Sequence, residues 1–169
     1  MLALAPPVSL KPIEQIAVEV VPPPGFEIAV DQTKHGAGII SKFVERHWHG
    51  PAGVTMVLLL DDSISIESYS VAAELGHAIE QTRELYPAEK VEAAHVFVVN
   101  RKEWILIRTR GDYHGTKYRR IALLTHHREI YLQMHFVGPY ESLKEMVGYI
   151  EFEMRLLSGA KPDDPILPL

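Results

Sequence analysis

The chain of 169 residues contains no cysteine. It therefore cannot form a disulfide, a thiolate metal site or a cysteine nucleophile. Long hydrophobic stretches are also absent, because the longest apolar run, residues 54–60, is far shorter than the ~20 residues that a membrane-spanning helix requires. We therefore expect no membrane span.

The catalytic signatures that a single sequence can reveal are missing as well. The chain has no G-x-S-x-G nucleophile elbow, no G-x-x-x-x-G-K-[ST] phosphate-binding loop and no H-E-x-x-H zinc motif. Gly36-Ala37-Gly38 resembles the start of a dinucleotide-binding loop, but Ser41 occupies the third glycine position and a strand-like segment follows. We interpret this segment as a turn, and we expect no cofactor.

Length and composition indicate a single folded domain. Hydrophobic residues make up 47% of the chain and charged residues 23%, which is an ordinary globular composition. Prolines gather near both ends, where they disfavour regular structure. We predict a flexible, Pro-containing arm over residues 1–12, one α+β domain over residues 13–159 and a Pro-rich tail over residues 160–169.

Net charge limits the partners. The formal charge of −5 supplies no whole-protein field that would attract nucleic acid or an anionic membrane, so we expect no nucleic-acid partner. A homodimer is compatible with the sequence. The segment Ala3-x-Ala5 resembles the end of a signal peptide, but a basic n-region and a full hydrophobic region are missing. The compartment stays unknown, with the cytoplasm favoured and export left open.

Seven segments have the strand signature of β-branched or aromatic residues bounded by turn residues. They are residues 26–30, 39–48, 54–60, 91–99, 104–110, 117–125 and 129–137. The links between the last four are too short to contain a parallel crossover. We therefore predict an antiparallel sheet in which these four strands form a meander.

Two further segments have helical periodicity. The first starts from an N-cap at Ser65 and continues to Tyr86, where Pro87 ends it. The second, Leu143 to Leu157, has one continuous apolar stripe and is followed by Gly159. The predicted order is β-β-β-α-β-β-β-β-α, an α+β fold in which helices pack on an antiparallel β-sheet.

This layout resembles the Mog1/PsbP-like superfamily. The likeness lies in the opening Pro22-Pro23-Pro24-Gly25-Phe26-Glu27-Ile28, the single helix after three strands, the meander and the closing Gly138-Pro139-Tyr140-Glu141-Ser142-Leu143 helix entry. The resemblance implies an α/β/α sandwich and a binding or accessory role, because that superfamily includes GTPase-binding factors, photosystem subunits and secretion chaperones. No functional residue is carried over, since no binding motif of those branches matches position by position.

Histidines are the candidate metal ligands. In His47-Trp48-His49 the two imidazoles project from the same face of a strand, so both can reach one ion. A third ligand would come from His35, His95, His135 or Asp61. The alternative is that both histidines are solvated at a strand end beside a turn. We favour the alternative, assign no metal site and keep His47 and His49 as candidates.

Basic residues concentrate in one part of the chain. Between Arg101 and Arg128 eight basic residues accompany two acidic ones, within a chain whose net charge is −5. Guanidinium groups bind carboxylate and phosphate bidentately. The candidate contacts for an anionic ligand or a partner protein are Arg108, Arg110, Lys117, Arg119, Arg120, Tyr131 and His135. The alternative is that these side chains keep an exposed sheet solvated and pair with helix glutamates.

The missing catalytic motifs, the charge concentration and the resemblance favour a non-catalytic binding or accessory protein. Its sheet face or basic hairpin would contact another protein or an anionic ligand. The alternative is a histidine-based, metal-dependent enzyme acting on a small molecule, in which His47 and His49 hold the metal and a bound water is the nucleophile.

Overall fold

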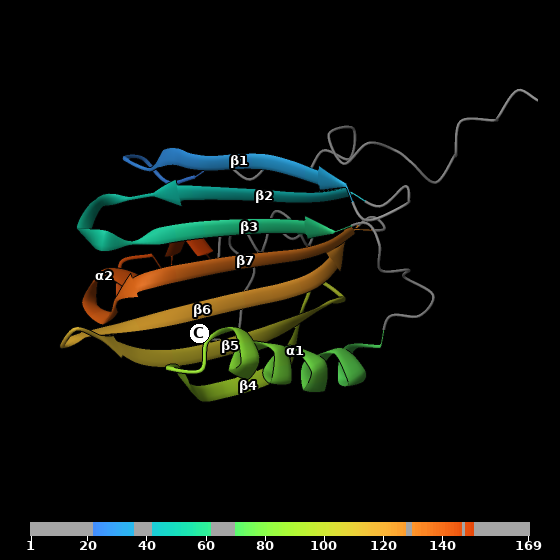
Figure 1. Cartoon of the computed structure of the whole chain (residues 1–169). Coiled ribbons are helices and arrows are strands. Elements are labelled where there is room, and N and C mark those ends of the chain that lie inside the picture. The colour runs from blue at the N-terminus through green and yellow to red at the C-terminus, as the bar shows by residue number, and fades with distance from the viewer. Residues whose placement is uncertain (1–21, 36–41, 62–69, 128–129, 147, 151–169) are drawn as a thin grey trace, which may run out of the picture.

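The structure is a computed structural model that describes residues 22–35, 42–61, 70–127, 130–146 and 148–150. It is a mixed α+β fold dominated by one seven-stranded antiparallel sheet, with a few helices (Figure 1). The predicted arm over residues 1–12 and the predicted tail over residues 160–169 lie outside the described residues.

The sheet is antiparallel at every pairing. Its strands are β1 (Glu27–His35), β2 (Lys42–His49), β3 (Thr55–Asp61), β4 (Lys90–Val99), β5 (Lys102–Tyr113), β6 (Thr116–His127) and β7 (Ile130–Pro139). Their spatial order is β1-β2-β3-β7-β6-β5-β4, so the expected meander of β4 to β7 is confirmed. β7 pairs with β3 on one side and with β6 on the other, which leaves β1 and β4 as the two edges.

Strands β5 and β6 extend further toward their shared turn than the sequence predicts. The link between the predicted strands over residues 104–110 and 117–125 is reduced to His114 and Gly115, both of which have positive φ, as the favoured hairpin turns require. Gly111 belongs to β5 and lies opposite Tyr118, whose ring occupies the space that a Cβ at position 111 would fill, 2.5 Å away. Regular pairing between β5 and β6 thus extends to Tyr113 and Thr116.

Within the described residues α1 begins later than expected, whereas α2 begins earlier. α1 (Val71–Leu85) begins after Ser70, not after Ser65, which lies outside the described part. It ends before Pro87, as the pattern predicts. A short 3-10 helix, η2 (Pro51–Gly53), connects β2 to β3. α2 (Tyr140–Lys144) follows β7 directly, residues 145–146 form a turn and residues 148–150 are again helical. Residues 147 and 151–157 of the predicted second helix are not described.

Two hydrophobic clusters lie on opposite faces of the sheet, because residues alternate between the faces along each strand. The first contains Met134 and Phe136 of β7 and is covered by Leu143, Met146 and Ile150. The second contains Ile105 and Ile107 of β5 and is covered by α1 through Ala78, Leu75 and Ile79. We call these the α2 face and the α1 face, and Figure 1 shows α1 over β4 and β5.

Candidate functional site

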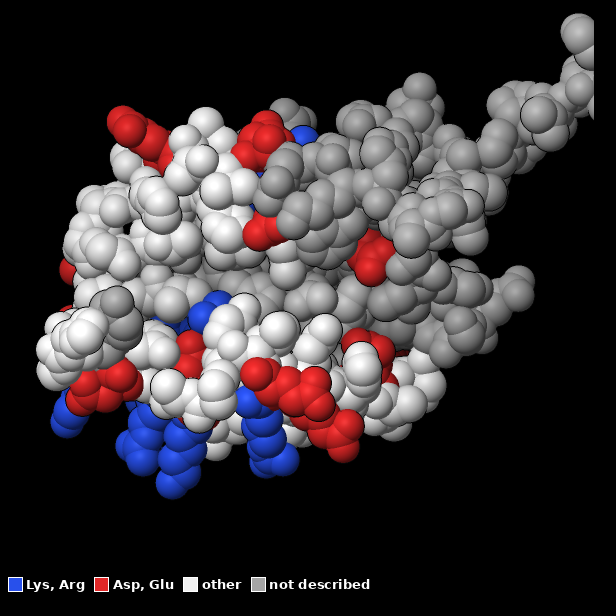
Figure 2. Space-filling view, in the orientation of Figure 1, with Lys and Arg blue, Asp and Glu red and all other residues white. Residues whose placement is uncertain are grey.

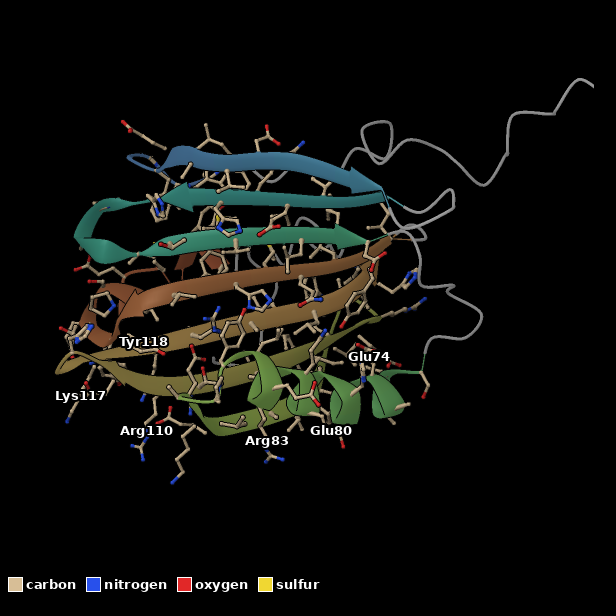
Figure 3. The ribbon with its side chains drawn as sticks, in the orientation of Figure 1. Glu74, Glu80, Arg83, Arg110, Lys117 and Tyr118 are labelled. Atoms are coloured by element: carbon tan, nitrogen blue, oxygen red, sulfur yellow. The ribbon has the colours of Figure 1, made fainter. Side chains whose placement is uncertain are left out.

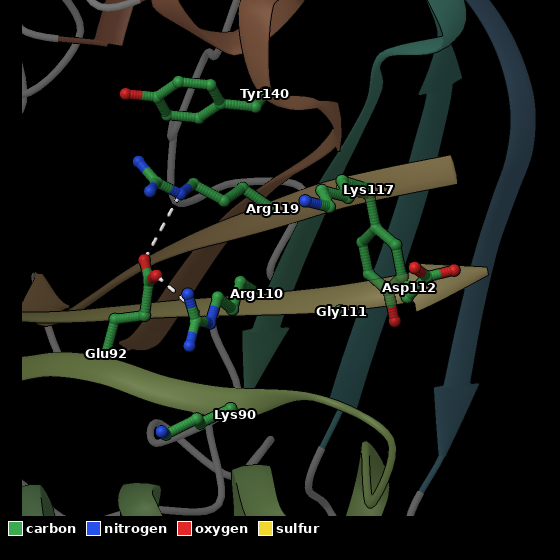
Figure 4. A pocket seen from close by; sticks show the side chains of 9 residues that line it. Lys90, Glu92, Arg110, Gly111, Asp112, Lys117, Arg119 and Tyr140 are labelled. Carbon is green, nitrogen blue, oxygen red and sulfur yellow. Dashed lines mark ion pairs between the residues drawn. The ribbon is translucent and has the colours of Figure 1, made fainter. Parts of the chain in front are cut away.

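Three arginine side chains surround one carboxylate on the α2 face. Arg108 and Arg110 project from β5, and Arg119 of β6 lies directly opposite Arg110. Oε2 of Glu92 lies 3.2 Å from Nε of Arg119, and its Oε1 lies 3.5 Å from Nε of Arg110 (Figure 4). The same Oε2 lies 3.5 Å from Nε of Arg108. We call Arg108, Arg110 and Arg119 the arginine cluster.

A β-bulge in the edge strand β4 positions Glu92. Val91 pairs with Thr109 and Ala93 pairs with Arg108, so Glu92 is the additional residue without a partner of its own in the register. A bulge places two residues opposite one and bends the strand locally. The bulge directs the Glu92 carboxylate toward the three guanidinium groups, and the side chain is only 17% exposed.

The polar contacts of this cluster are incomplete. Oε2 of Glu92 and Nε of Arg108 are buried atoms that form no hydrogen bond in the described structure, although their charges attract each other at 3.5 Å. Three guanidinium groups share a single carboxylate, so positive charge remains in excess. A carboxylate or phosphate of a ligand in contact with Arg110 or Arg119 would offset this excess charge.

A pocket of about 490 Å³ adjoins the arginine cluster (Figure 4). Cations dominate its lining, which comprises Lys90, Glu92, Arg110, Gly111, Asp112, Lys117, Tyr118, Arg119 and Tyr140. Lysine and arginine side chains gather along the lower left edge of the molecule in Figure 2, where Figure 3 labels Lys117 and Arg110. We call this space the first pocket.

Tyr140, the first residue of α2, forms the aromatic wall of the first pocket. The guanidinium carbon of Arg119 lies 3.9 Å from the centre of its ring, and Nζ of Lys144 lies 4.5 Å from the same centre. Such cation–π contacts hold a guanidinium group in place without neutralising its charge. A second pocket, of about 160 Å³, is lined by Leu106, Arg108, Arg119, Ile121, Tyr140, Leu143 and Lys144.

Arg120, which the sequence groups with the other basic residues, lies on the α1 face. Its Nη2 lies 3.0 Å from Oε1 of Glu89 and its Nε lies 3.1 Å from Oε2. The Glu89 side chain is 2% exposed and also accepts a 2.5 Å hydrogen bond from the Thr109 hydroxyl. The ring of Tyr86 covers the Arg120 guanidinium at 3.6 Å. Arg120 is therefore one half of a buried ion pair, separate from the arginine cluster.

Tyr131 and His135 also lie on the α1 face. Tyr131 is 3% exposed and its hydroxyl donates a 2.7 Å hydrogen bond to Glu74, which connects β7 to α1. His135 is 8% exposed and its Nε2 lies 3.1 Å from Oε1 of Gln133. Of the expected contacts, the structure thus brings together Arg108, Arg110, Lys117 and Arg119, and places Arg120, Tyr131 and His135 on the other face.

His47 and His49 share one face of β2, as alternation predicts, but they contact different groups. Nε2 of His47 lies 2.6 Å from Oε1 of Glu45, whereas Nδ1 of His49 lies 3.2 Å from the Thr55 hydroxyl. Among the side chains that the structure describes, no three histidine or carboxylate groups gather to hold a metal ion. The side chain of His35 is outside that set.

Several residues of the site are absent from the sequence prediction, among them Glu92, Lys90 and Tyr140. For Glu92 and Lys90, the signal in the sequence was the pair of charged residues on either side of Val91, which alternation places on one face of a strand. The partners of Glu92 depend on the pairing of β4 with β5, which no local pattern reveals. Tyr140 was visible only as part of the entry to the last helix.

Comparisons with known proteins agree with the fold and go no further. No protein-family model and no curated protein matches the chain. A solved structure, that of PA94 from Pseudomonas aeruginosa, a protein of unknown function described as a candidate regulator, matches with a TM-score of 0.53 and 10% identity. The match covers 83% of this chain and 100% of that one. At this identity the likeness shows the fold alone.

One finding concerns membranes. Within the described residues, none of the helices combines the length and the apolar character needed to cross a bilayer.

The buried ion pair of Glu89 and Arg120 should matter far more for stability than an exposed one. Arg120→Ala leaves a buried carboxylate without its partner and should lower the free energy of unfolding by about 3–5 kcal/mol in urea titrations. Arg46→Ala is the matched control, because Arg46 pairs with the exposed Asp31 at 3.2 Å and should cost at most about 1 kcal/mol. Similar losses in the two variants would contradict this assignment.

Burial, together with the positive charges of Arg120 and His47, lowers the pKa of His135 from 6.5 to about 3. The unfolded chain therefore binds a proton below pH 6.5 that the folded protein does not bind. This contribution to stability is complete above pH 6.5 and is lost as the pH falls toward 3, by roughly 1 kcal/mol per pH unit. Urea titrations between pH 7.5 and pH 4.5 should show that His135→Gln flattens this dependence.

The exposed His77 on α1 is the control for that series, and His77→Gln should keep the wild-type pH dependence. A His135→Gln variant whose stability follows the wild-type pH profile would show that His135 does not take up a proton on unfolding.

Proposed function

We propose that the chain is a non-catalytic binding or accessory protein that captures an acidic segment of a partner protein at the arginine cluster. The observation that carries this proposal is the convergence of three guanidinium groups on the one carboxylate of Glu92, beside the first pocket. Arg110 and Arg119 line the first pocket, so a ligand there can reach their positive charge. A carboxylate complements that charge.

The lining of the first pocket supports binding more than catalysis. It includes no histidine, serine or threonine among the described residues, and guanidinium groups stay protonated and do not transfer protons. Partial burial, with the nearby carboxylate of Glu89, raises the pKa of Tyr118, which keeps its hydroxyl protonated. Glu92 is occupied by three cations. Asp112, the other carboxylate of the lining, accepts a hydrogen bond from the Gly115 amide, so donors and positive charge dominate the site.

The resemblance to the Mog1/PsbP-like superfamily belongs to this proposal. Two helices on opposite faces of an antiparallel sheet support an α/β/α sandwich, and an accessory role is what the resemblance implies. The metal-dependent enzyme remains the alternative hypothesis. Elemental analysis of the untagged protein tests it, because stoichiometric metal that disappears on joint replacement of His47 and His49 would favour that alternative.

Charge reversal at the first pocket should remove binding of an acidic peptide. Arg110 is suited to this test, because its side chain is 59% exposed and its replacement should leave the core intact. We expect Arg110→Glu to bind a labelled glutamate-rich peptide at least roughly tenfold more weakly than wild type, as measured by fluorescence anisotropy in about 50 mM salt. The same peptide with glutamine in place of glutamate should not bind.

Arg83→Glu is the matched control, since Arg83 is exposed on α1 and projects away from the sheet (Figure 3). This variant has the same net charge as Arg110→Glu and should retain wild-type affinity. Unchanged melting temperatures would show that both variants are folded. Equal affinity for the two peptides, or equal losses in the two variants, would overturn the proposed function.

A further inference from the structure

We infer that the acidic segment carries a large apolar side chain next to its carboxylate, and that the second pocket receives this side chain. The inference rests on the proposed function and specifies the ligand. Arg119 and Tyr140 line both pockets, so their stacked side chains form a common wall between a cationic space and a smaller one.

The floor of the second pocket is part of the hydrophobic core. Leu106, Ile121 and Leu143 line it, and all three belong to the cluster on the α2 face. Their exposed fractions are only 1%, 6% and 2%, so the floor of this small recess is the surface of the core. An apolar group that enters it gains dispersion contacts and leaves water.

The rim of the second pocket is cationic. Arg108, Arg119 and Lys144 surround its entrance, and the buried Nε of Arg108 has no hydrogen-bond partner in the described structure. Lys144 pairs with Glu141 at 3.3 Å, whereas Arg108 and Arg119 have to share Glu92. A purely apolar ligand would leave the excess charge of these two arginines uncompensated, whereas a purely anionic one would leave the apolar floor empty. A carboxylate beside a leucine-sized side chain satisfies both requirements.

The extent of the cationic surface favours a peptide over a small free acid. The two pockets together run from Asp112 and Lys117 near the tip of the β5–β6 hairpin to Lys144 at the end of α2. Arg119 and Tyr140 lie between these limits. A chain of several residues can follow this path, with its carboxylate at the arginine cluster and its apolar side chain behind Tyr140.

Four matched peptides test the inference by fluorescence anisotropy with the full chain. The parent has one aspartate followed by leucine in a glycine–serine background. In the others, asparagine replaces the aspartate, alanine replaces the leucine, or both changes are made. We expect the alanine peptide to bind roughly tenfold more weakly than the parent, because it leaves the apolar recess unfilled. The asparagine peptide should lose at least as much.

Enlarging the second pocket should change which apolar side chain of the peptide binds best. Ile121→Ala enlarges the recess, so it should shift preference by several-fold from the leucine peptide toward one with phenylalanine at that position, while the dependence on aspartate persists. Because Ile121 is a core residue, Ile121→Val provides a milder variant that should give a smaller shift in the same direction.

Each result separates the inference from the proposed function. Binding that requires the aspartate but is indifferent to the leucine would overturn the inference and leave the proposed function in place. A small acid, 4-methylpentanoate, that binds as tightly as the parent peptide and displaces it would overturn the assignment to a peptide. Failure of every acidic peptide to bind would overturn both.

Discussion

One carboxylate holds three guanidinium groups together at the hairpin end of the sheet, and the character of this face depends on it. Arg110 and Arg119 are directly opposite each other on paired strands, an arrangement in which like charges repel. Glu92 offsets this repulsion because the bulge in β4 places it beside both. The balance is only partial, since one negative charge faces three positive ones. An external anion would complete it.

The hairpin of β5 and β6 uses its two faces for different purposes. Arg119 and Arg120 are neighbours in sequence and therefore point to opposite sides of the sheet. Arg120 meets the buried carboxylate of Glu89 in good hydrogen-bonding geometry and is covered by Tyr86, so its charge is used within the fold. Arg119 shares Glu92 with two other arginines and rests on an exposed tyrosine ring. Only the surroundings of Arg119 leave positive charge available to a partner.

Local patterns were enough to predict the antiparallel meander and the concentration of basic residues in it, because short links and charge content are local properties. They were not enough to assign Arg120, whose partner Glu89 lies 31 residues away in the chain. The bulge that positions Glu92 and the insertion of β7 beside β3 also depend on long-range pairing. The sequence therefore indicated a basic surface. Only the three-dimensional arrangement shows which of these cations pair within the fold and which remain available to a ligand.

The most direct test of the central claim is the thermal unfolding of Glu92→Gln with and without sulfate. Removing the charge while keeping the shape should lower the Tm at low salt, and added sulfate should raise the Tm of this variant more than that of wild type. Glu80→Gln, on the exposed surface of α1, should behave as wild type in both conditions. An unchanged Tm and an equal response to sulfate in all three proteins would contradict the account.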